Sequence, residues 1–165
     1  MLKETIFQNL NSAVKEKRVL EVSVLRQLLA VFLNKEKEKR FKLSKEKPDI
    51  SVSDLEKESV LNDEEAVKSI SSEAKKRKES ITEFEKGGRK DLVEKEKKEL
   101  EILEKYLPKQ LEEDEIKQLV KQAIEKTGTK SIKEIGKVMA ELMPQIKGKA
   151  DGGLVNKIVR ELLPA

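Results

Sequence analysis

NDEEAVKSISSEAKKRKESITEFEKGGRKDLVEKEKKELEILEKYLP, residues 62–108, is the stretch that decides the fold. Asn62 is followed three residues later by Glu65, which is the spacing of a capping box, where each side chain accepts a hydrogen bond from the other residue's backbone amide. Apolar residues then recur at steps of three or four as far as Phe84, with Arg77 as the one charge among them. This pattern predicts an amphipathic helix that begins after Asn62.

Two glycines, Gly87 and Gly88, end this helix in the sequence, because glycine readily adopts the left-handed conformation that terminates many helices. A second helix is predicted over about residues 90–106. One face of it carries Leu92, Glu96, Leu100, Leu103 and Leu107. The glycine corner between two helices of this length predicts a long antiparallel hairpin over residues 62–107.

The rest of the chain also shows helical periodicity, and an alternation typical of strands is never sustained, so we expect an all-α fold. A first helix carries Leu2, Ile6, Leu10 and Val14, and a second carries Leu25, Leu28, Leu29 and Phe32. The second runs into a charged segment, residues 34–40, which we interpret as a solvated helix end. Pro48 cannot continue a helix, and it predicts a mobile loop over residues 44–54.

The composition changes at Pro108, because all five aromatic residues precede it. We therefore predict an amino-terminal helical domain, residues 1–108, and a three-helix carboxy-terminal domain, residues 109–165. Its helices are expected at about residues 112–126, 131–143 and 151–163. The boundary signals are Gly128 at the end of the first helix, a capping box of Ser131 and Glu134 before the second, Pro144 at its end and Asp151 as the cap of the third.

The composition excludes several classes of function. The 165 residues include no cysteine and no histidine, which removes disulfide frameworks, Cys/His zinc sites, thiol nucleophiles and imidazole bases. No carboxylate cluster has the spacing of a metal site, and no phosphate-binding loop follows a strand. We therefore expect no catalytic residue, no cofactor and no metal. Since no apolar run has the length of a signal peptide or a membrane span, we expect a cytoplasmic protein that does not associate with membranes.

Two segments resemble a known family. RKESITEFEKGGRKDLVEKEKKELEILEKYLPKQL, residues 77–111, and IGKVMAELMPQIKGKADGGLVNKIVRELL, residues 135–163, closely resemble the YqeY proteins. The same tail domain ends the B subunit of glutamyl-tRNA and aspartyl-tRNA amidotransferases. A weaker match over VLRQLLAVFLNKEKEK, residues 24–39, extends the resemblance to nearly the whole chain.

In the amidotransferases this tail is a helical appendage that helps to hold tRNA, whereas the chemistry belongs to other domains and subunits. The resemblance therefore implies tRNA or another structured RNA as the ligand, and no complete active site. Two alternatives remain open. In the first, the protein is an adaptor that docks through the hairpin of residues 62–107 on an amidotransferase or an aminoacyl-tRNA synthetase. In the second, it takes part in glutamine-dependent amidation of tRNA, as a carbon–nitrogen ligase with glutamine as the amido donor.

The charge distribution gives the tail some means to bind RNA. The whole chain carries 36 basic and 32 acidic residues, a net charge of +4. From Ile116 onward there are ten basic and five acidic residues, and 10 − 5 gives +5. The segment lacks aromatic residues, so backbone contact with structured RNA is favoured over base stacking. The candidate RNA-binding residues are Lys133, Gly136, Lys137, Lys147, Gly148, Lys149, Lys157 and Arg160; the alternative is a merely solvated lysine face.

Three further features have structural and functional interpretations. Charges on or beside apolar stripes should be paired, so Arg26, Arg77, Glu96 and Glu99 are expected to form an internal network that fixes helix register. Gly136 lies inside a predicted helix, where it costs about 1 kcal/mol relative to alanine; close helix packing or approach of an RNA backbone would explain it. KGKADGG, residues 147–153, is interpreted as a turn whose following amides leave room for a phosphate.

Overall fold

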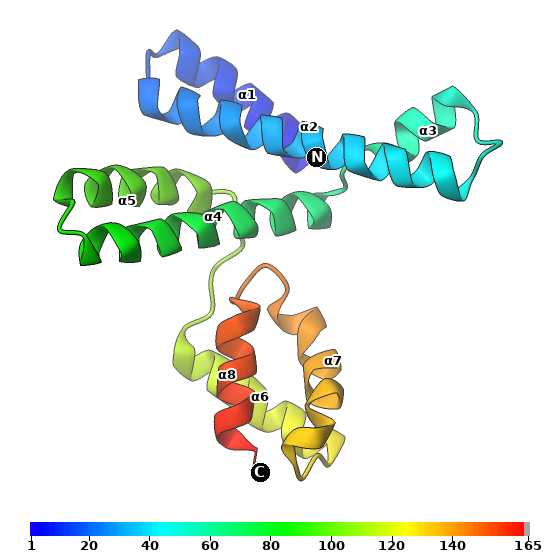
Figure 1. Cartoon of the computed structure of the whole chain (residues 1–165), viewed down its shortest axis with the longest axis vertical. Helices are drawn as coiled ribbons and strands as arrows, with labels where there is room; N and C mark the ends of the chain where they lie inside the picture. The colour runs from blue at the N-terminus through cyan, green and yellow to red at the C-terminus, as the bar shows by residue number, and fades with distance from the viewer. Residues whose placement is uncertain (164–165) are drawn as a thin grey trace. The chain divides into compact units, whose positions relative to one another are not determined.

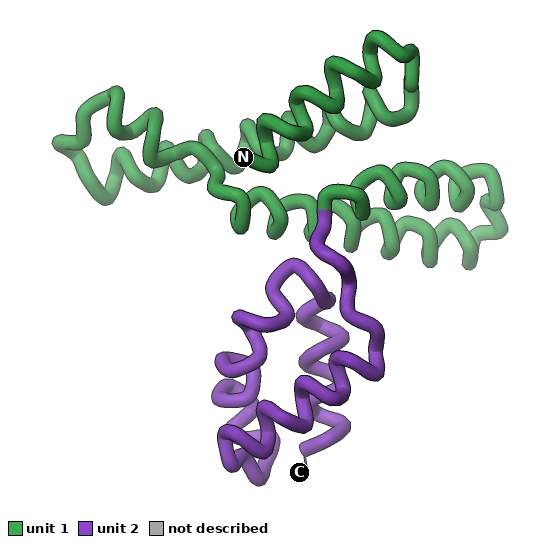
Figure 2. Tube along the Cα trace, turned by 180° about the vertical axis from the view of Figure 1, so that it is seen from behind, with its two compact units in different colours: residues 1–106 green, residues 107–165 purple. Residues whose placement is uncertain are grey.

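The computed structural model describes residues 1–163, and within them the chain forms eight α-helices, one short 3₁₀ helix and no strand (Figure 1). The all-α fold is confirmed. The elements are α1 Leu2–Lys15, α2 Val19–Glu46, α3 Val52–Ser59, α4 Asp63–Lys86, α5 Lys90–Glu104, α6 Glu113–Thr127, η1 Ile132–Glu134, α7 Ile135–Ile146 and α8 Gly152–Leu162. The chain divides into two compact units, Met1–Tyr106 and Leu107–Ala165 (Figure 2).

Helices α4 and α5 form the hairpin that the opening stretch predicts. The Asn62 side chain accepts a hydrogen bond from the Glu65 amide at 2.9 Å, and the Glu65 carboxylate accepts one from the Asn62 amide at 2.9 Å. The corner turns at Gly88, whose φ of 68° lies in the left-handed region that glycine adopts without steric cost. Arg89 then closes the corner by donating its amide to the Phe84 carbonyl at 2.9 Å.

Helices α1 and α2 pack beside one another in the same unit. Ile6, Leu10 and Ala13 of α1 are buried, whereas Val14, which the stripe places inside, is 47% exposed. From α2 the core receives Val24, Leu25, Leu28 and Phe32. Helix α2 is much longer than α1, and its carboxy-terminal part packs against α3 (Figure 1).

The loop expected over residues 44–54 is shorter than predicted. Helix α2 continues to Glu46, and α3 begins at Val52 with Ser51 as its cap, which accepts a hydrogen bond from the Asp54 amide at 3.1 Å. The physical reason is that Pro48 restricts only its own position and the residue before it, so the preceding turn stays helical.

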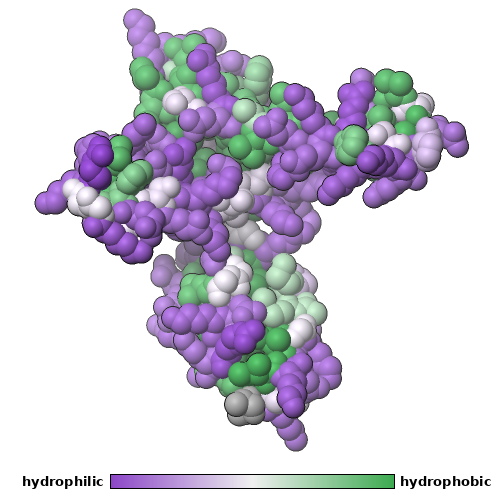
Figure 3. Space-filling view, viewed as in Figure 1, coloured by the Kyte–Doolittle hydropathy of each residue, from purple (hydrophilic) through white to green (hydrophobic). Residues whose placement is uncertain are grey.

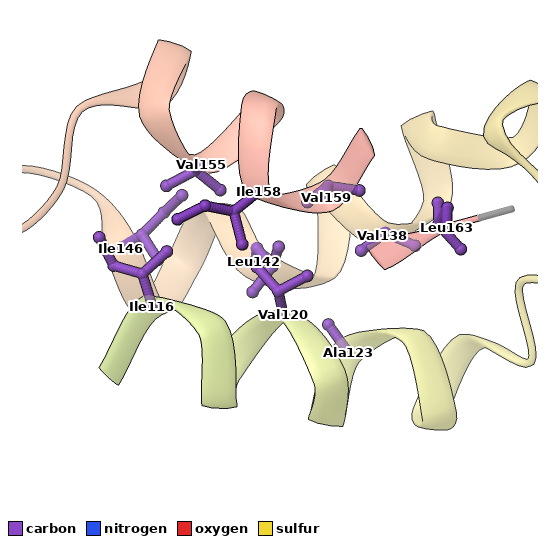
Figure 4. Packing of buried hydrophobic residues seen from close by; sticks show 10 residues of the cluster. All are labelled: Ile116, Val120, Ala123, Val138, Leu142, Ile146, Val155, Ile158, Val159 and Leu163. Carbon is purple, nitrogen blue, oxygen red and sulfur yellow. The ribbon is translucent and has the colours of Figure 1, made fainter. Parts of the chain in front are cut away.

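The carboxy-terminal unit encloses a separate hydrophobic core between α6, α7 and α8 (Figure 4). The described members of the core are Ile116, Val120, Ala123, Val138, Leu142, Ile146, Val155, Ile158, Val159 and Leu163. Most of these side chains are fully buried and come from all three helices. Each helix of this unit therefore contributes one apolar face and leaves its charged face to solvent.

Two of the predicted helix boundaries in this unit are wrong. Ser131 has an extended backbone and its side chain makes no capping hydrogen bond, because the 3₁₀ turn η1 intervenes before α7 and Glu134 instead pairs with Lys137 at 2.5 Å. Pro144 lies inside α7, which continues to Ile146. Pro144 gives up one helical hydrogen bond and crowds the carbonyl four residues earlier, but the buried Ile146 holds the last turn against the core.

Candidate nucleic-acid interface

The residues predicted to bind RNA lie in three separate places in the carboxy-terminal unit. Lys133, Gly136 and Lys137 lie at the amino end of α7, Lys147, Gly148 and Lys149 lie in the turn between α7 and α8, and Lys157 and Arg160 lie along α8. Ten residues of helix and turn separate Lys137 from Lys147, which is about 15 Å at the rise of an α-helix. The structure therefore does not gather these residues into one continuous patch.

The amino end of α7 offers lysines in a conformation free to meet a ligand. Lys133 is exposed and makes no ion pair within residues 1–163. Lys137 pairs with Glu134 at 2.5 Å, with both side chains largely in solvent. This ion pair is the main cause that lowers the pKa of the Glu134 carboxyl. Because such an exposed pair contributes little, its lysine is available to a phosphate at small cost.

Gly136 has no packing reason in the structure. A Cβ placed there would meet no heavy atom within 4 Å. Close helix packing, one of the two explanations that the sequence offers, is therefore wrong for this glycine. Gly136 still lowers the stability of the helix relative to alanine. Of the two explanations offered by the sequence analysis, close approach of a ligand is the one that remains.

Sequence reasoning overlooked Lys130, in the turn that leads into η1. Lys130 is exposed and makes no ion pair within the described part of the chain. With Lys133, Gly136 and Lys137 it forms the segment 130–137, which we call the α7 start segment. The signal was present in the count of basic residues, but only the fold shows that Lys130 belongs to this end of the unit.

The KGKADGG segment acts as a turn. Gly148 has a φ of 73°, and its carbonyl accepts a hydrogen bond from the Gln110 side chain at 2.9 Å. The Lys149 carbonyl accepts another from the Leu111 amide at 2.8 Å, while the Lys149 amide itself donates to Ile146 at 2.8 Å. The turn amide of Lys149 is thus used to close α7, and it is not available to cradle a phosphate.

The amino end of α8 is only partly open. Asp151 caps the helix by accepting a hydrogen bond from the Leu154 amide at 2.9 Å, as predicted. Its carboxylate places negative charge where a phosphate would approach. The acidic segment 112–115 follows Leu111, which is itself bonded to the turn, so this end of the unit carries further negative charge. The α7 start segment is the better phosphate site of the two.

The two basic residues of α8 make exposed contacts with neighbouring side chains of the unit. Lys157 lies 3.9 Å from Glu161, and it also contributes to the lowered pKa of Glu113, whose main cause is the ion pair with Lys117. Arg160 donates to the Asn156 side chain at 2.9 Å. The effect on Glu113 shows that Lys157 lies near the start of α6.

In the amino-terminal unit, one arginine joins three helices. Arg77 of α4 lies 3.0 Å from Glu96 and 2.6 Å from Glu99, both on α5, and it donates to the Gln27 side chain on α2 at 2.8 Å. Glu99 is buried, with 6% of its side chain exposed. Arg26, which the sequence assigns to this network, is exposed on α2, and its neighbour Gln27 takes that place.

No group of three or more acidic side chains in the described residues is arranged to hold a metal ion. Among the same residues, no helix is long and apolar enough to cross a membrane.

These observations define a small all-α protein of two units, in which the carboxy-terminal one is a bundle of three α-helices around its own hydrophobic core. The family model described as Yqey-like protein matches residues 47–163, well over half of the chain. The chain belongs to the YqeY family.

A curated relative is altered inheritance of mitochondria protein 41, a mitochondrial protein of Pyrenophora tritici-repentis (strain Pt-1C-BFP). It is 39% identical over 102 residues, which cover 58% of this chain and 54% of the relative. The chain thus spans about half the length of the curated relative it matches.

The cytoplasmic location predicted from the sequence is contradicted by this relative, which is a mitochondrial protein. That prediction rested on the lack of a signal-like apolar run. Because mitochondrial targeting segments are amphipathic and lack such a run, the argument does not separate the cytoplasm from a mitochondrion.

Proposed function

We propose that this YqeY-family protein is an RNA-binding accessory factor whose preferred ligand is tRNA, and that its carboxy-terminal unit contacts the phosphate backbone. The observation that carries the proposal is the α7 start segment. It combines Lys130 and Lys133, which make no ion pair within the described residues, with a helical glycine in open space. The resemblance to the amidotransferase tail supplies the class of ligand.

Physical chemistry favours backbone contact over base recognition here. Exposed lysines are compact point charges that neutralise phosphates and release counterions. The described carboxy-terminal unit offers no aromatic side chain on which a base could stack, so sequence-specific binding of splayed bases has no platform. The ligand is therefore expected to be folded RNA, recognised by its shape and charge.

The test is a filter-binding titration of total tRNA over a series of salt concentrations. The double variant Lys130→Gln with Lys133→Gln should bind more weakly and should reduce the slope of log K against log salt by roughly one unit for each lysine. The matched control, Lys109→Gln with Lys121→Gln, removes the same charge from exposed positions of the same unit and should stay near wild type. No binding of tRNA by the wild type at low salt would overturn the proposal.

A protein-interaction adaptor is the second candidate, and one observation favours it. Met1, Phe7, Leu29 and Val60 surround a shallow pocket of about 480 Å³ on the amino-terminal unit, and Phe7 is 55% exposed. No large exposed hydrophobic residue among the described ones lies on the α4–α5 hairpin, so the docking surface would be α1 and α2 instead.

For the adaptor, the test is capture of an amidotransferase or a synthetase after nuclease treatment. Phe7→Ser should abolish capture, whereas Val19→Ser, at an exposed position at the start of α2, should not. Equal capture by both variants would remove this pocket from consideration. Amidation is tested separately: purified protein with ATP, glutamine and misacylated tRNA is expected to give no amidated product.

A further inference from the structure

The charged stretch of α2 lines a groove against α4. The groove has a volume of about 480 Å³ and lies within the amino-terminal unit. Its walls are Lys35, Glu38, Lys39 and Lys42 from α2, Leu61, and Glu65, Lys68, Ser69 and Ser72 from α4. Leu61 and Ser69 are the buried members, so the floor is narrow and the charged side chains form the rim. We call it the α2–α4 groove.

Helical spacing places three lysines on this groove. Lys35, Lys39 and Lys42 are separated by four and three residues, so they share one face of α2. Like charges at this spacing destabilise a helix by a few tenths of a kcal/mol. Lys37 lies about 200° around the helix from Lys35, on another face of α2, and it is a control position in the experiment below. Glu38 lies on the same face, three residues after Lys35 and four before Lys42, and it offsets part of this repulsion.

The groove has more positive charge than its own carboxylates neutralise. Lys35 pairs with Glu38 and Lys39 pairs with Glu65, each at 2.8 Å. Lys42 contributes to the lowered pKa of the Glu38 carboxyl, whose main cause is Lys35, and Lys68 lines the α4 side of the groove. Four lysines against two glutamates leave an excess of two positive charges, 4 − 2, at the rim.

The shape and the side chains indicate which anion would bind. The Ser69 hydroxyl is already used, since it donates to the Glu65 carbonyl at 2.9 Å. The groove therefore offers no buried hydroxyl donor that would hold a single phosphate tightly. Each of its long, exposed lysines gives only a weak contact. A ligand that presents several phosphates in a row gains from all of them together. A polynucleotide backbone has this chemistry.

We infer that the α2–α4 groove binds the phosphate backbone of RNA, as a contact surface additional to that of the carboxy-terminal unit. The inference takes its ligand class from the proposed function, but its residues lie in the other unit. The α2 side of the groove also lies outside residues 47–163, the part of the chain that matches the family model. Its α4 side, with Glu65 and Lys68, lies inside that part.

The experiment uses the full chain and labelled total tRNA. Lys42→Gln with Lys68→Gln should weaken binding about ten-fold at low salt and reduce the salt slope by roughly two units. The matched control, Lys37→Gln with Lys98→Gln, removes the same charge from other exposed positions and should leave affinity and slope near wild type. A groove variant that behaves like this control overturns the inference.

Two further arms separate the possible outcomes. If the groove variant is unaffected while Lys130→Gln with Lys133→Gln loses affinity, the groove inference fails and the proposed function stands. If the groove variant loses affinity while the other does not, the groove stands and the α7 start segment does not. Inorganic pyrophosphate at matched ionic strength should not displace tRNA from the wild type; displacement that is lost in the groove variant would show that the groove takes a small phosphate compound and would overturn the RNA assignment.

Discussion

At Gly136, one substitution is expected to change the stability of the protein and its affinity for RNA in opposite directions. Alanine should fit there without contact, since no heavy atom lies within 4 Å of a Cβ. The change removes backbone freedom from the unfolded chain, so Gly136→Ala should stabilise the protein by about 0.5–1 kcal/mol in denaturant unfolding. If RNA approaches this backbone, the same variant should bind tRNA more weakly. A more stable variant with unchanged affinity would show that the glycine does not serve the ligand.

Arg77 holds two largely buried carboxylates at once. Arg77→Met would leave Glu96 and Glu99 without their shared cation, and only Lys95, 3.8 Å from Glu99, would remain nearby. Removal of one partner from such a buried cluster costs about 3–5 kcal/mol. Denaturant unfolding should show this loss. Glu96→Gln is the control, and it should cost much less because the pair of Arg77 with Glu99 survives; equal losses would contradict the buried-charge argument.

The same cluster shows how far single residues can be placed from a sequence. Arg77, Glu96 and Glu99 interrupt narrow apolar stripes, so the sequence marks them as charges that need partners. The stripe on α2 is broader, with buried residues at Val24, Leu25, Leu28 and Phe32, and it does not fix the rotation of the helix. One residue around a helix is about 100°, and the place assigned to Arg26 is taken by Gln27.

At the scale of the elements, the corner between α4 and α5 depends on one of its two glycines. Gly88 has a φ of 68°, whereas Gly87 has a φ of −80° that any residue adopts. Gly88→Ala should therefore cost about 1–2 kcal/mol, the price of a left-handed conformation for a residue with a Cβ. At Gly87 the nearest atom to a Cβ is 3.5 Å away, so Gly87→Ala should be near neutral. Thermal unfolding of the two variants gives the comparison, and equal destabilisation would refute it.

The cap of α4 predicts a specific pH dependence. The ion pair with Lys39 is the largest cause that lowers the pKa of the Glu65 carboxyl, and the hydrogen bond from the Asn62 amide adds to it. A carboxyl with a lowered pKa stabilises the fold above its unfolded pKa of about 4.3, and this stability is lost as the pH falls through the lower folded value. Because the side chain is 36% exposed, the stabilisation should stay below about 1 kcal/mol.

Glu65→Gln measures this contribution. The glutamine oxygen can still accept the Asn62 amide, so the variant removes mainly the ion pair. The difference in unfolding free energy between wild type and variant should be constant near neutral pH and should shrink toward zero below about pH 4. Asn62→Ala is the control, because it removes a neutral cap and should cost about 1 kcal/mol with little dependence on pH. A Glu65→Gln difference that grows in acid would contradict the sign of this argument.

Seven of the eight α-helices in the described residues could be predicted from the sequence, whereas α3 and several helix ends could not. Asn62 and Asp151 were placed correctly because a cap needs only residues three positions away. Ser131 has the same local signal, but a 3₁₀ turn follows it and the expected capping bond does not form. Pro144 was expected to end α7 at residue 143, yet the helix continues for nearly one more turn, to Ile146, which is buried in the core. Tertiary packing decides these ends, and local sequence does not contain it.

At the scale of the whole molecule, the candidate interface was only partly predictable. The basic character of the tail is visible in its composition, but α7 separates Lys133 and Lys137 from Lys147 and Lys149 by its own length. The lysines of α2 alternate with glutamates, and in the sequence they look like a solvated helix end. On the face shown in Figure 3, hydrophilic side chains cover most of the surface. Charge alone therefore marks no site in this chain, and helix geometry is needed to select one.

Because each unit has its own hydrophobic core, a core substitution in one unit should destabilise that unit and leave the other unchanged. Leu142 is fully buried among residues of α6, α7 and α8 only, and Leu25 is fully buried in the core of the other unit. Leu142→Ala should cost about 2–5 kcal/mol, a large fraction of the stability of so small a unit. Hydrogen exchange should then show lost protection in α6, α7 and α8, with α4 and α5 unchanged.

Leu25→Ala is the reciprocal variant, and it should lower protection in α1 and α2 while α6 to α8 keep theirs. Both variants delete the same side-chain atoms at positions of equal burial. A difference in which helices lose hydrogen-exchange protection therefore reports the division into two cores, and not a difference in the size of the cavity. Loss of protection that spreads through all helices in either variant would mean that the two units unfold as one. In that case a ligand bound by the α7 start segment would also stabilise the α2–α4 groove, because ligand binding to the native state stabilises everything that unfolds with it.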